Sequence, residues 1–233
     1  MCLGILINVE TDNASGPSLD DKGFQNLFDG KTLAGWKVTP LKAKDDWTVK
    51  EGVIVGKGGK FRSYLEYQKK DIADFELKFE YRFKTAGNSG VNIRAIPDPT
   101  GKRGFQAYHA DLGHVGIGKN ILGAWDFHTP GRKEHGCFRG DRLVIDSEDK
   151  PTIAKIKDPI QLSEIKKRDW NRVHLIVRDN RFQFWINGKL SAEFTEHLPQ
   201  QKRLHRGAIQ LQLHDPEMVV EFRQIKLKLL KKD

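Results

Sequence analysis

Residues 75–95 read FELKFEYRFKTAGNSGVNIRA, and this stretch carries the clearest strand pattern in the chain. From Phe75 to Phe83, apolar and charged residues alternate, which is the period of a β-strand with one buried face. After a Gly- and Asn-containing segment at residues 86–90, the same period returns over residues 91–95. The stretch therefore predicts two antiparallel strands joined by a turn.

The polar faces of these two strands are candidates for a binding surface. They carry carboxylates, a carboxamide and guanidinium groups, which can exchange hydrogen bonds with a polyol. Glu80, Asn92 and Arg94 belong to this face by strand parity. The alternative is an ordinary solvated face, because half-exposed antiparallel sheets are common.

Alternation recurs along the rest of the chain and predicts an all-β fold. Strands are expected in six further regions, residues 47–56, 63–65, 104–111, 170–194, 207–214 and 219–227. Short strands with frequent turn signals and almost no helical periodicity are typical of a β-sandwich. We expect residues 75–95 and 207–214 to lie in one concave sheet.

Domain organisation follows from length and local composition. Residues 1–22 are rich in Asp, Asn, Ser and Gly and are predicted to form an N-terminal tail. Residues 23–233 are expected to form one domain, since all-β sandwiches of this size are often single.

The composition of the 233-residue chain excludes several classes of protein. It has 38% hydrophobic and 30% charged residues, with a mean hydropathy of −0.58, so no membrane span is expected. The net charge of +9 raises the question of a nucleic-acid partner, but the basic residues are dispersed and no recognition motif accompanies them. No nucleic acid is therefore predicted. Cys2 and Cys137 are too few for a disulfide framework.

Two His/Asp pairs flank the long aperiodic segment 112–142. His109 and Asp111 are two residues apart, as are Asp126 and His128. Nitrogen and oxygen donors of this kind could bind a divalent cation, or they could belong to a solvated loop. Loops of this length in a compact domain are often functional.

The segment Gly207–His214 places further polar groups on one face. Gln210, Gln212 and His214 alternate with apolar residues, so the sequence puts all three on the polar side of a strand. Trp125 is either a platform for stacking a sugar or part of the core. The other four tryptophans, Trp36, Trp47, Trp170 and Trp185, lie in packed strand patterns and are predicted to be core.

Seven segments occur in an order that resembles one family. They are GFQNLFDGKTLAGW (23–36), WTVKEGVIVG (47–56), DFELKFEYRF (74–83), GNSGVNIRA (87–95), DWNRVHLIVRDNRFQFWINGK (169–189), GAIQLQLHD (207–215) and VVEFRQIKLK (219–228). This arrangement resembles the 3-keto-disaccharide hydrolase family. The resemblance implies a concanavalin A-like jelly roll of two curved antiparallel sheets, a carbohydrate on the concave sheet, and bacterial relatives that are periplasmic or secreted. The N-terminus of this chain does not form an intact signal peptide.

The activity that the resemblance implies is cleavage of a 3-keto glycoside. The ketone acidifies the C2 hydrogen, so a base can remove it, the C1 oxygen is expelled, and water then adds back. Such a reaction needs a base tuned near neutral pH, a donor or cation for the enolate oxygen, and a donor for the leaving group. Many relatives carry Glu where this chain has Gln106, so a role based on that carboxylate does not transfer.

Two hypotheses follow. In the first, the protein is a glycosidic-bond hydrolase with His214 or His109 as the base at C2, Arg94 or a bound cation at the enolate, and Glu80 or Asp111 as further catalytic candidates. Its predicted substrate-binding residues are Asn92, Arg94, Gln106, Trp125, Asp126, His128 and Gln212. No cofactor is required by the sequence. In the second, which the Gln at position 106 favours, the protein is a non-catalytic carbohydrate-binding module.

Overall fold

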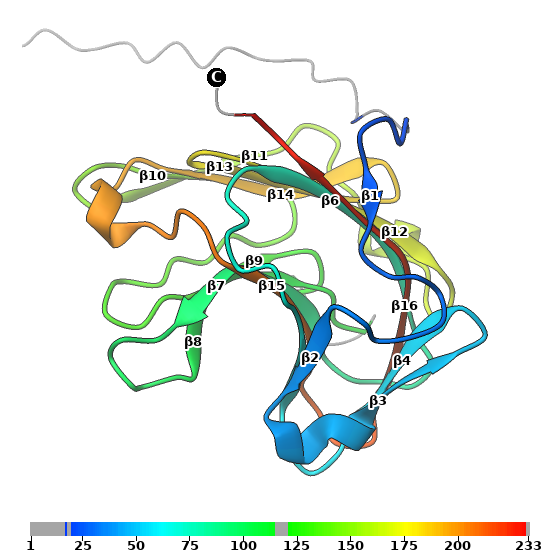
Figure 1. The fold of residues 1–233 in the computed structure, drawn as a ribbon. Coiled ribbons are helices and arrows are strands. Elements are labelled where there is room, and N and C mark those ends of the chain that lie inside the picture. The colour runs from blue at the N-terminus through cyan, green and yellow to red at the C-terminus, as the bar shows by residue number, and fades with distance from the viewer. Residues whose placement is uncertain (1–16, 18–19, 115–120, 232–233) are drawn as a thin grey trace, which may run out of the picture.

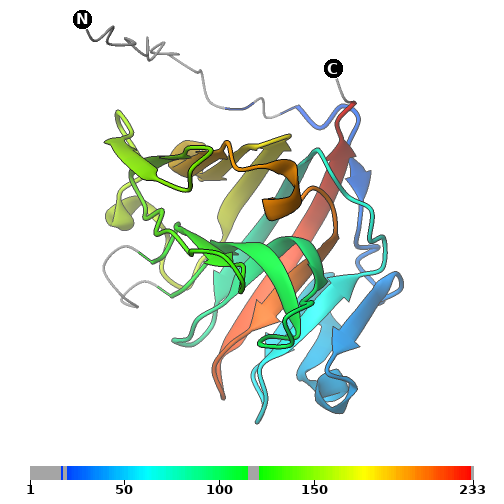
Figure 2. The ribbon, with the colours of Figure 1, turned by 90° about the vertical axis from the view of Figure 1, so that its left-hand side faces the viewer.

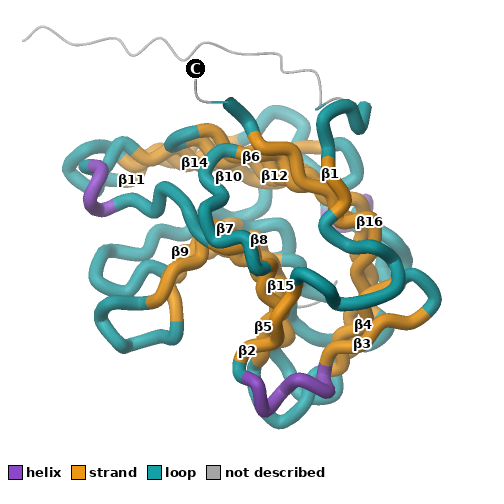
Figure 3. Tube along the Cα trace, in the orientation of Figure 1, coloured by secondary structure: helices purple, strands orange, loops and turns teal. Residues whose placement is uncertain are grey.

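The computed structural model describes residue 17, residues 20–114 and residues 121–231, and it consists of two stacked β-sheets (Figure 1). Most of the predicted N-terminal tail, including Cys2, lies outside the described residues. The all-β jelly-roll prediction is confirmed: 3-10 turns occur only at the edges of the two layers (Figure 3).

One sheet has ten strands. Its path is β11 (Pro151–Lys155), β10 (Asp141–Ile145), β14 (Lys189–Glu196), β13 (Arg181–Ile186), β12 (Asn171–Arg178), β6 (Phe75–Phe83), β16 (Val219–Leu229), β4 (Val53–Lys57) and β3 (Trp47–Lys50), with β1 (Gln25–Asn26) pairing to β16. All neighbours in this sheet are antiparallel except β10 and β14, which run parallel.

The other sheet has six antiparallel strands. Its path is β2 (Trp36–Thr39), β5 (Ser63–Tyr67), β15 (Ala208–Leu213), β7 (Gly90–Pro97), β8 (Phe105–Asp111) and β9 (Trp125–His128). Three short 3-10 helices complete the described elements, η1 (Leu41–Asp46), η2 (Leu162–Glu164) and η3 (Gln200–Lys202). The two curved layers are also visible side-on in Figure 2.

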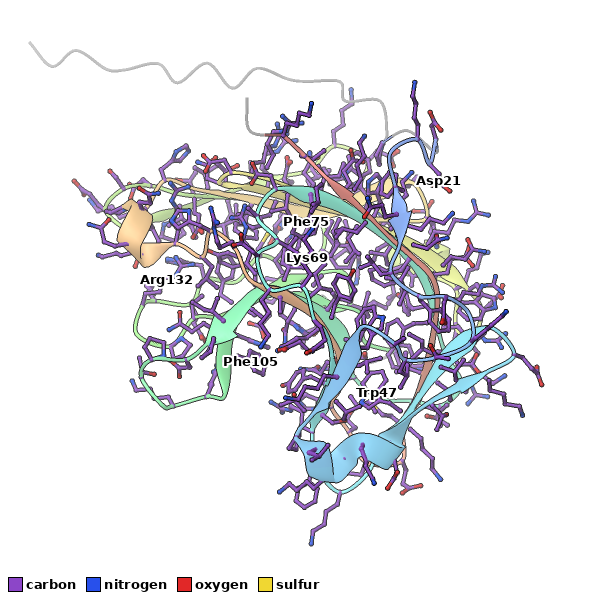
Figure 4. The ribbon with its side chains drawn as sticks, viewed as in Figure 1. Asp21, Trp47, Lys69, Phe75, Phe105 and Arg132 are labelled. Carbon is purple, nitrogen blue, oxygen red and sulfur yellow. The ribbon has the colours of Figure 1, made fainter. Side chains whose placement is uncertain are left out.

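The core lies between the sheets because each contributes its apolar strand face. On β6, every odd-numbered residue from Phe75 to Phe83 is buried while the charged residues between them are half-buried. On β15, Ile209, Leu211 and Leu213 enter the same core cluster. Figure 4 shows Phe75 between the layers, whereas Phe105 lies on the open side of the six-stranded sheet.

The predicted hairpin over residues 75–95 is wrong. Strand β6 pairs with β12 and β16 in the ten-stranded sheet, while β7 pairs with β8 and β15 in the other. Residues 84–89 therefore cross between the sheets. Alternation identified both strands, but it carries no information about which strand is the hydrogen-bonding partner.

Other local predictions hold. Hairpins join β3 to β4, β12 to β13, and β13 to β14, the last through Asn187 and Gly188. The segment 112–142 is not wholly irregular, because it contains β9. The prediction that Trp170 belongs to the core is wrong. Its side chain is half-buried on the outer face of the ten-stranded sheet, in contact with the guanidinium groups of Arg82 and Arg223.

Candidate active-site groove

A groove of about 750 Å³ lies on the face of the six-stranded sheet that points away from the ten-stranded sheet. Its lining is mostly polar or charged and comes from all six strands and their connections. The lining residues used below are Arg62, Tyr64, Glu66, Asn88, Phe105, His109, Asp111, Asp126, His128, Gln210, Gln212 and His214.

Strand register assembles five polar residues into a row across the sheet, which we call the cross-strand row. Glu66 is opposite Gln210, Gln210 is opposite Asn92, Asn92 is opposite His109, and His109 is opposite Asp126. Side chains at paired positions point to the same face of a sheet. Residues distant in the sequence therefore meet on the floor of the groove.

His109 lines the groove, and its side chain is held by three neighbours. Its Nδ1 lies 2.7 Å from Asn92 Oδ1, and its ring stacks on that of His128 with centroids 4.8 Å apart. A methyl group placed on Gly90 would come within 2.1 Å of His109 Nε2, so the ring lies directly over this glycine. Burial, and then the charge of His128, holds the pKa of His109 well below 6.5. His109 is thus a neutral imidazole at neutral pH.

Asp111 is the neighbouring side chain on the same face of β8. It is buried, and burial raises the pKa of its carboxyl to about 8 even though the Gly113 amide donates to Oδ1 (3.0 Å). His109, a neutral base, and Asp111, a protonated acid, are therefore two residues apart on one strand. Many active sites assign the base and acid roles to two groups whose environments shift their pKa values apart.

The second predicted pair, Asp126 and His128, is joined by a side-chain hydrogen bond at the edge of the sheet. His128 Nε2 lies 3.0 Å from Asp126 Oδ2, and this contact lowers the pKa of Asp126 to about 2. Asp126 remains a carboxylate at all physiological pH values and can accept hydrogen bonds from a ligand.

His214 has both ring nitrogens engaged. Its Nδ1 lies 2.6 Å from Asp215 Oδ1, and its Nε2 contacts Arg62 Nη2. Because Asp215 fixes the proton on Nδ1, Nε2 accepts from the guanidinium. The positive charge of Arg62 contributes to lowering the pKa of His109, so this guanidinium lies near the imidazole.

Two amide oxygens in the groove have no hydrogen-bond partner among the described residues. They are Gln212 Oε1, on a side chain that is 1% exposed, and Asn88 Oδ1. Buried polar atoms are normally paired, so each oxygen is suited to accept from a ligand hydroxyl. Tyr64 and Phe105, whose rings meet edge to face at 4.7 Å, supply aromatic surface nearby.

Arg94 does not point into the groove. It has a positive φ of 49° at a bulge in β7, and its side chain turns inward. There it pairs with Asp74 at 3.0 Å and donates to the carbonyl oxygens of Ala73, Asp179 and Leu204. The bulge reverses strand parity after Ile93, so the sequence-based placement is wrong.

Three other predicted positions also lie elsewhere. Glu80 is on the outer face of the ten-stranded sheet, paired with Arg223 at 2.6 Å. Gln106 points away from the groove and donates to Asp98 and to the Pro130 carbonyl oxygen. Trp125 is 1% exposed and packs on core phenylalanines, so it is not a sugar platform.

A divalent cation held by His109, Asp111, Asp126 and His128 stays a prediction. Within residues 20–114 and 121–231, no three His, Cys, Asp or Glu side chains come together as metal ligands.

Sequence reasoning missed several groove residues. Tyr64 and Glu66 alternate with Leu65, a signal that strand parity could have used. Asn88 was assigned to a hairpin turn, and Arg62 precedes its strand, so neither had a local signal. Gln210 stood on the polar face of its strand but was not assigned a role.

Comparison with known proteins places the chain in a family. A profile of the 3-keto-alpha-glucoside-1,2-lyase-like domain matches residues 23–228. The sequence has no significant match among curated proteins. Within the described residues, no helix is long and apolar enough to cross a bilayer.

Solved structures with low sequence identity share the fold. A provisionally described glycosyl hydrolase from Parabacteroides distasonis ATCC 8503 is 20% identical, with a TM-score of 0.57 over 90% of this chain and 94% of that one. The carbohydrate-binding module CBM66 from Bacillus subtilis is 13% identical, with a TM-score of 0.53 over 85% of this chain and 98% of that one. Because the family profile covers most of its length, the chain belongs to the 3-keto-alpha-glucoside-1,2-lyase-like family, the 3-keto-disaccharide hydrolase family expected from its sequence motifs.

Proposed function

We propose that this protein cleaves the glycosidic bond of 3-keto glycosides in the groove, with His109 as the base and Asp111 as the acid. The observation that carries the proposal is the pairing of a neutral imidazole and a protonated carboxyl on one face of β8. Family membership supports the class of substrate.

In the first half of the reaction, His109 Nε2 takes the C2 proton and the electron pair of the C–H bond enters the enolate of the C3 ketone. When the ketone re-forms, a C1–C2 double bond is created and the bond from C1 to the leaving oxygen breaks. That oxygen takes the proton of Asp111. The substrate has then lost its aglycone by elimination.

In the second half, water adds across the new double bond. The Asp111 carboxylate takes a proton from water while the oxygen bonds to C1, and the protonated His109 returns a proton to C2. Both side chains regain their starting protonation states, and the net reaction is hydrolysis.

The enolate needs a positive partner, and Arg62 is the candidate that the groove offers in place of Arg94. Its guanidinium lines the groove beside His214 and lies near enough to His109 to influence the pKa of that imidazole. A guanidinium in a partly water-excluded groove stabilises developing negative charge.

The test is turnover of a 3-keto disaccharide such as 3-keto-trehalose, together with exchange of the C2 hydrogen in D2O. His109→Asn should lower kcat by roughly 10²- to 10⁴-fold and abolish exchange, because a general base is removed. His214→Asn should have a smaller effect, since its Nε2 is engaged by Arg62. Chelator should leave the rate unchanged. Glu80→Gln, on the outer face of the other sheet, is the matched control. Normal exchange in His109→Asn would assign the base to another group.

The second candidate function is a carbohydrate-binding module. It is favoured by the unpartnered acceptors Gln212 Oε1 and Asn88 Oδ1, which suit hydroxyl donors without requiring any reaction. Sugar binding by the parent protein with neither turnover nor C2 exchange would select this function.

A further inference from the structure

We propose that Glu66 is a positioning residue that fixes the tautomer of His109 from three strands away, through the carboxamides of Gln210 and Asn92. Its link to catalysis rests on the proposed function of His109, whereas its effect on the imidazole is independent of any substrate.

Four side chains of the cross-strand row form a continuous hydrogen-bonded chain. Gln210 Nε2 donates to Glu66 Oε2 at 2.7 Å, and Asn92 Nδ2 donates to Gln210 Oε1 at 3.0 Å. His109 Nδ1 lies 2.7 Å from the remaining Asn92 oxygen, Oδ1. The chain spans β5, β15, β7 and β8.

The direction of this chain is set at its carboxylate end. An ionised carboxylate can only accept, so Gln210 must present its NH2 group to Glu66 and its oxygen to Asn92. Asn92 must then present its own NH2 group to Gln210 and its oxygen to the imidazole. An oxygen facing Nδ1 requires that Nδ1 carries the proton, which leaves the lone pair on Nε2.

Burial keeps this chain intact. Asn92, His109 and Gln210 are 0%, 2% and 4% exposed, so water has little access to replace either carboxamide. Glu66 is itself anchored by Lys70, whose Nζ lies 3.6 Å from Glu66 Oε1. Polarised chains in a low-dielectric setting reinforce one another.

Without a carboxylate at position 66, the chain could run in either direction. A glutamine there can donate to Gln210 Oε1, after which Gln210 donates to Asn92 Oδ1 and Asn92 donates to His109 Nδ1. The proton of His109 would then be on Nε2, the atom that the proposed reaction needs free. Because glutamine and glutamate have nearly the same shape, the main effect of Glu66→Gln is on the direction of the hydrogen-bonded chain.

The experiment measures the tautomer directly by long-range 1H–15N correlation NMR on protein with 15N-labelled histidine, at a pH where His109 is neutral. The His109 signals are assigned by their loss in His109→Asn. We expect the Nδ1–H form in the parent protein and in Glu80→Gln, the control for replacing a partly buried carboxylate. In Glu66→Gln we expect a substantial fraction of the Nε2–H form.

A double variant tests the direction of the chain. In Glu66→Gln/Gln210→Glu, the carboxylate at 210 accepts from both neighbouring amides, so Asn92 again turns its oxygen to His109. We expect the Nδ1–H form to return. A structural defect at position 66 would not be repaired in this way. Folding of each variant is checked by the dispersion of its amide spectrum, and if the double variant does not fold, Glu66→Gln alone decides.

Two results would overturn the proposal: an Nε2–H tautomer in the parent protein, or an unchanged Nδ1–H tautomer in Glu66→Gln. For catalysis, Glu66→Gln should lower kcat for the 3-keto disaccharide more than it changes KM, in proportion to the lost tautomer. A tautomer shift in Glu66→Gln, together with a parent protein that does not turn over this substrate, would reject the proposed function and leave the positioning role standing.

Discussion

At the scale of single residues, His109 and Asp111 are neighbours on one strand face whose environments favour the uncharged form of each. Burial lowers the pKa of the imidazole and raises that of the carboxyl, because in both cases the charged form is the one that loses solvation. The same physical cause thus produces a free base and a free acid in one groove.

This pair predicts a bell-shaped pH dependence of kcat/KM for a 3-keto disaccharide. His109 must be neutral, and since its pKa is lowered, activity should be lost only as the pH falls below 6.5. Asp111 must be protonated, and since its pKa is about 8, activity should be lost as the pH rises through that value. Initial rates from pH 4 to 10 check both limbs.

A variant shows which residue causes the alkaline limb of this pH profile. In Asp111→Asn the alkaline limb should disappear while the acid limb persists at a lower rate. If the alkaline limb remains in that variant, it belongs to a different group.

At the scale of elements, β7 is adapted to its neighbours at two points along its length. Near its start, Gly90 leaves room for the imidazole of His109. Further along, the bulge at Arg94 packs against Gly207, where an added Cβ would lie 2.4 Å from the Arg94 carbonyl carbon. Glycine is required at positions 90 and 207 because the His109 ring and the Arg94 backbone leave no room for a Cβ atom.

Gly90→Ala should therefore impair both stability and the site. The added methyl group would lie 2.1 Å from His109 Nε2 and 2.6 Å from the Ala110 carbonyl oxygen, so the ring and the backbone must move. Overpacking of this kind costs about 1–3 kcal/mol. Urea unfolding and the C2 exchange assay should both report a loss.

The matched control for stability is Gly104→Ala, because no atom lies within 4 Å of a Cβ at that position. Its unfolding midpoint should be at least that of the parent. Equal midpoints for Gly90→Ala and Gly104→Ala would contradict the close approach of His109.

At the scale of the whole molecule, Arg94 links the two sheets. From β7 it reaches Asp74, which precedes β6, and the carbonyl oxygen of Asp179, between β12 and β13. Its guanidinium also lies 4.9 Å from the centre of the Phe182 ring on β13. Strand parity placed Arg94 on the binding face, but in the structure its buried side chain connects the two sheets.

Removing the Arg94 side chain should destabilise the protein strongly. Arg94→Leu leaves the Asp74 carboxylate without its cation, although the Asp179 amide still donates to it, and takes the guanidinium from three carbonyl oxygens. Breaking a buried ion pair costs roughly 3–5 kcal/mol. Arg223→Leu, which removes a more exposed pair with Glu80, should cost about 1 kcal/mol or less. Urea unfolding of both variants measures the difference, and similar midpoints would refute the structural role of Arg94.

From the sequence alone, the family and many of the strands were predictable, among them β6, β7, β8 and β12 to β16, whereas β9, β10 and β11 were not. Strand periodicity also placed Gln212 and His214 on one face, because the direction of a side chain on a strand depends only on local sequence, and the two-residue spacing of His109 and Asp111 marked them as a pair. Tertiary structure decided what periodicity cannot encode. It separated β6 from β7, which removed Glu80 from the groove, and its bulge turned Arg94 inward. It also brought Glu66 into register with Gln210 and Asn92, because strand pairing is set by contacts between segments far apart in the chain.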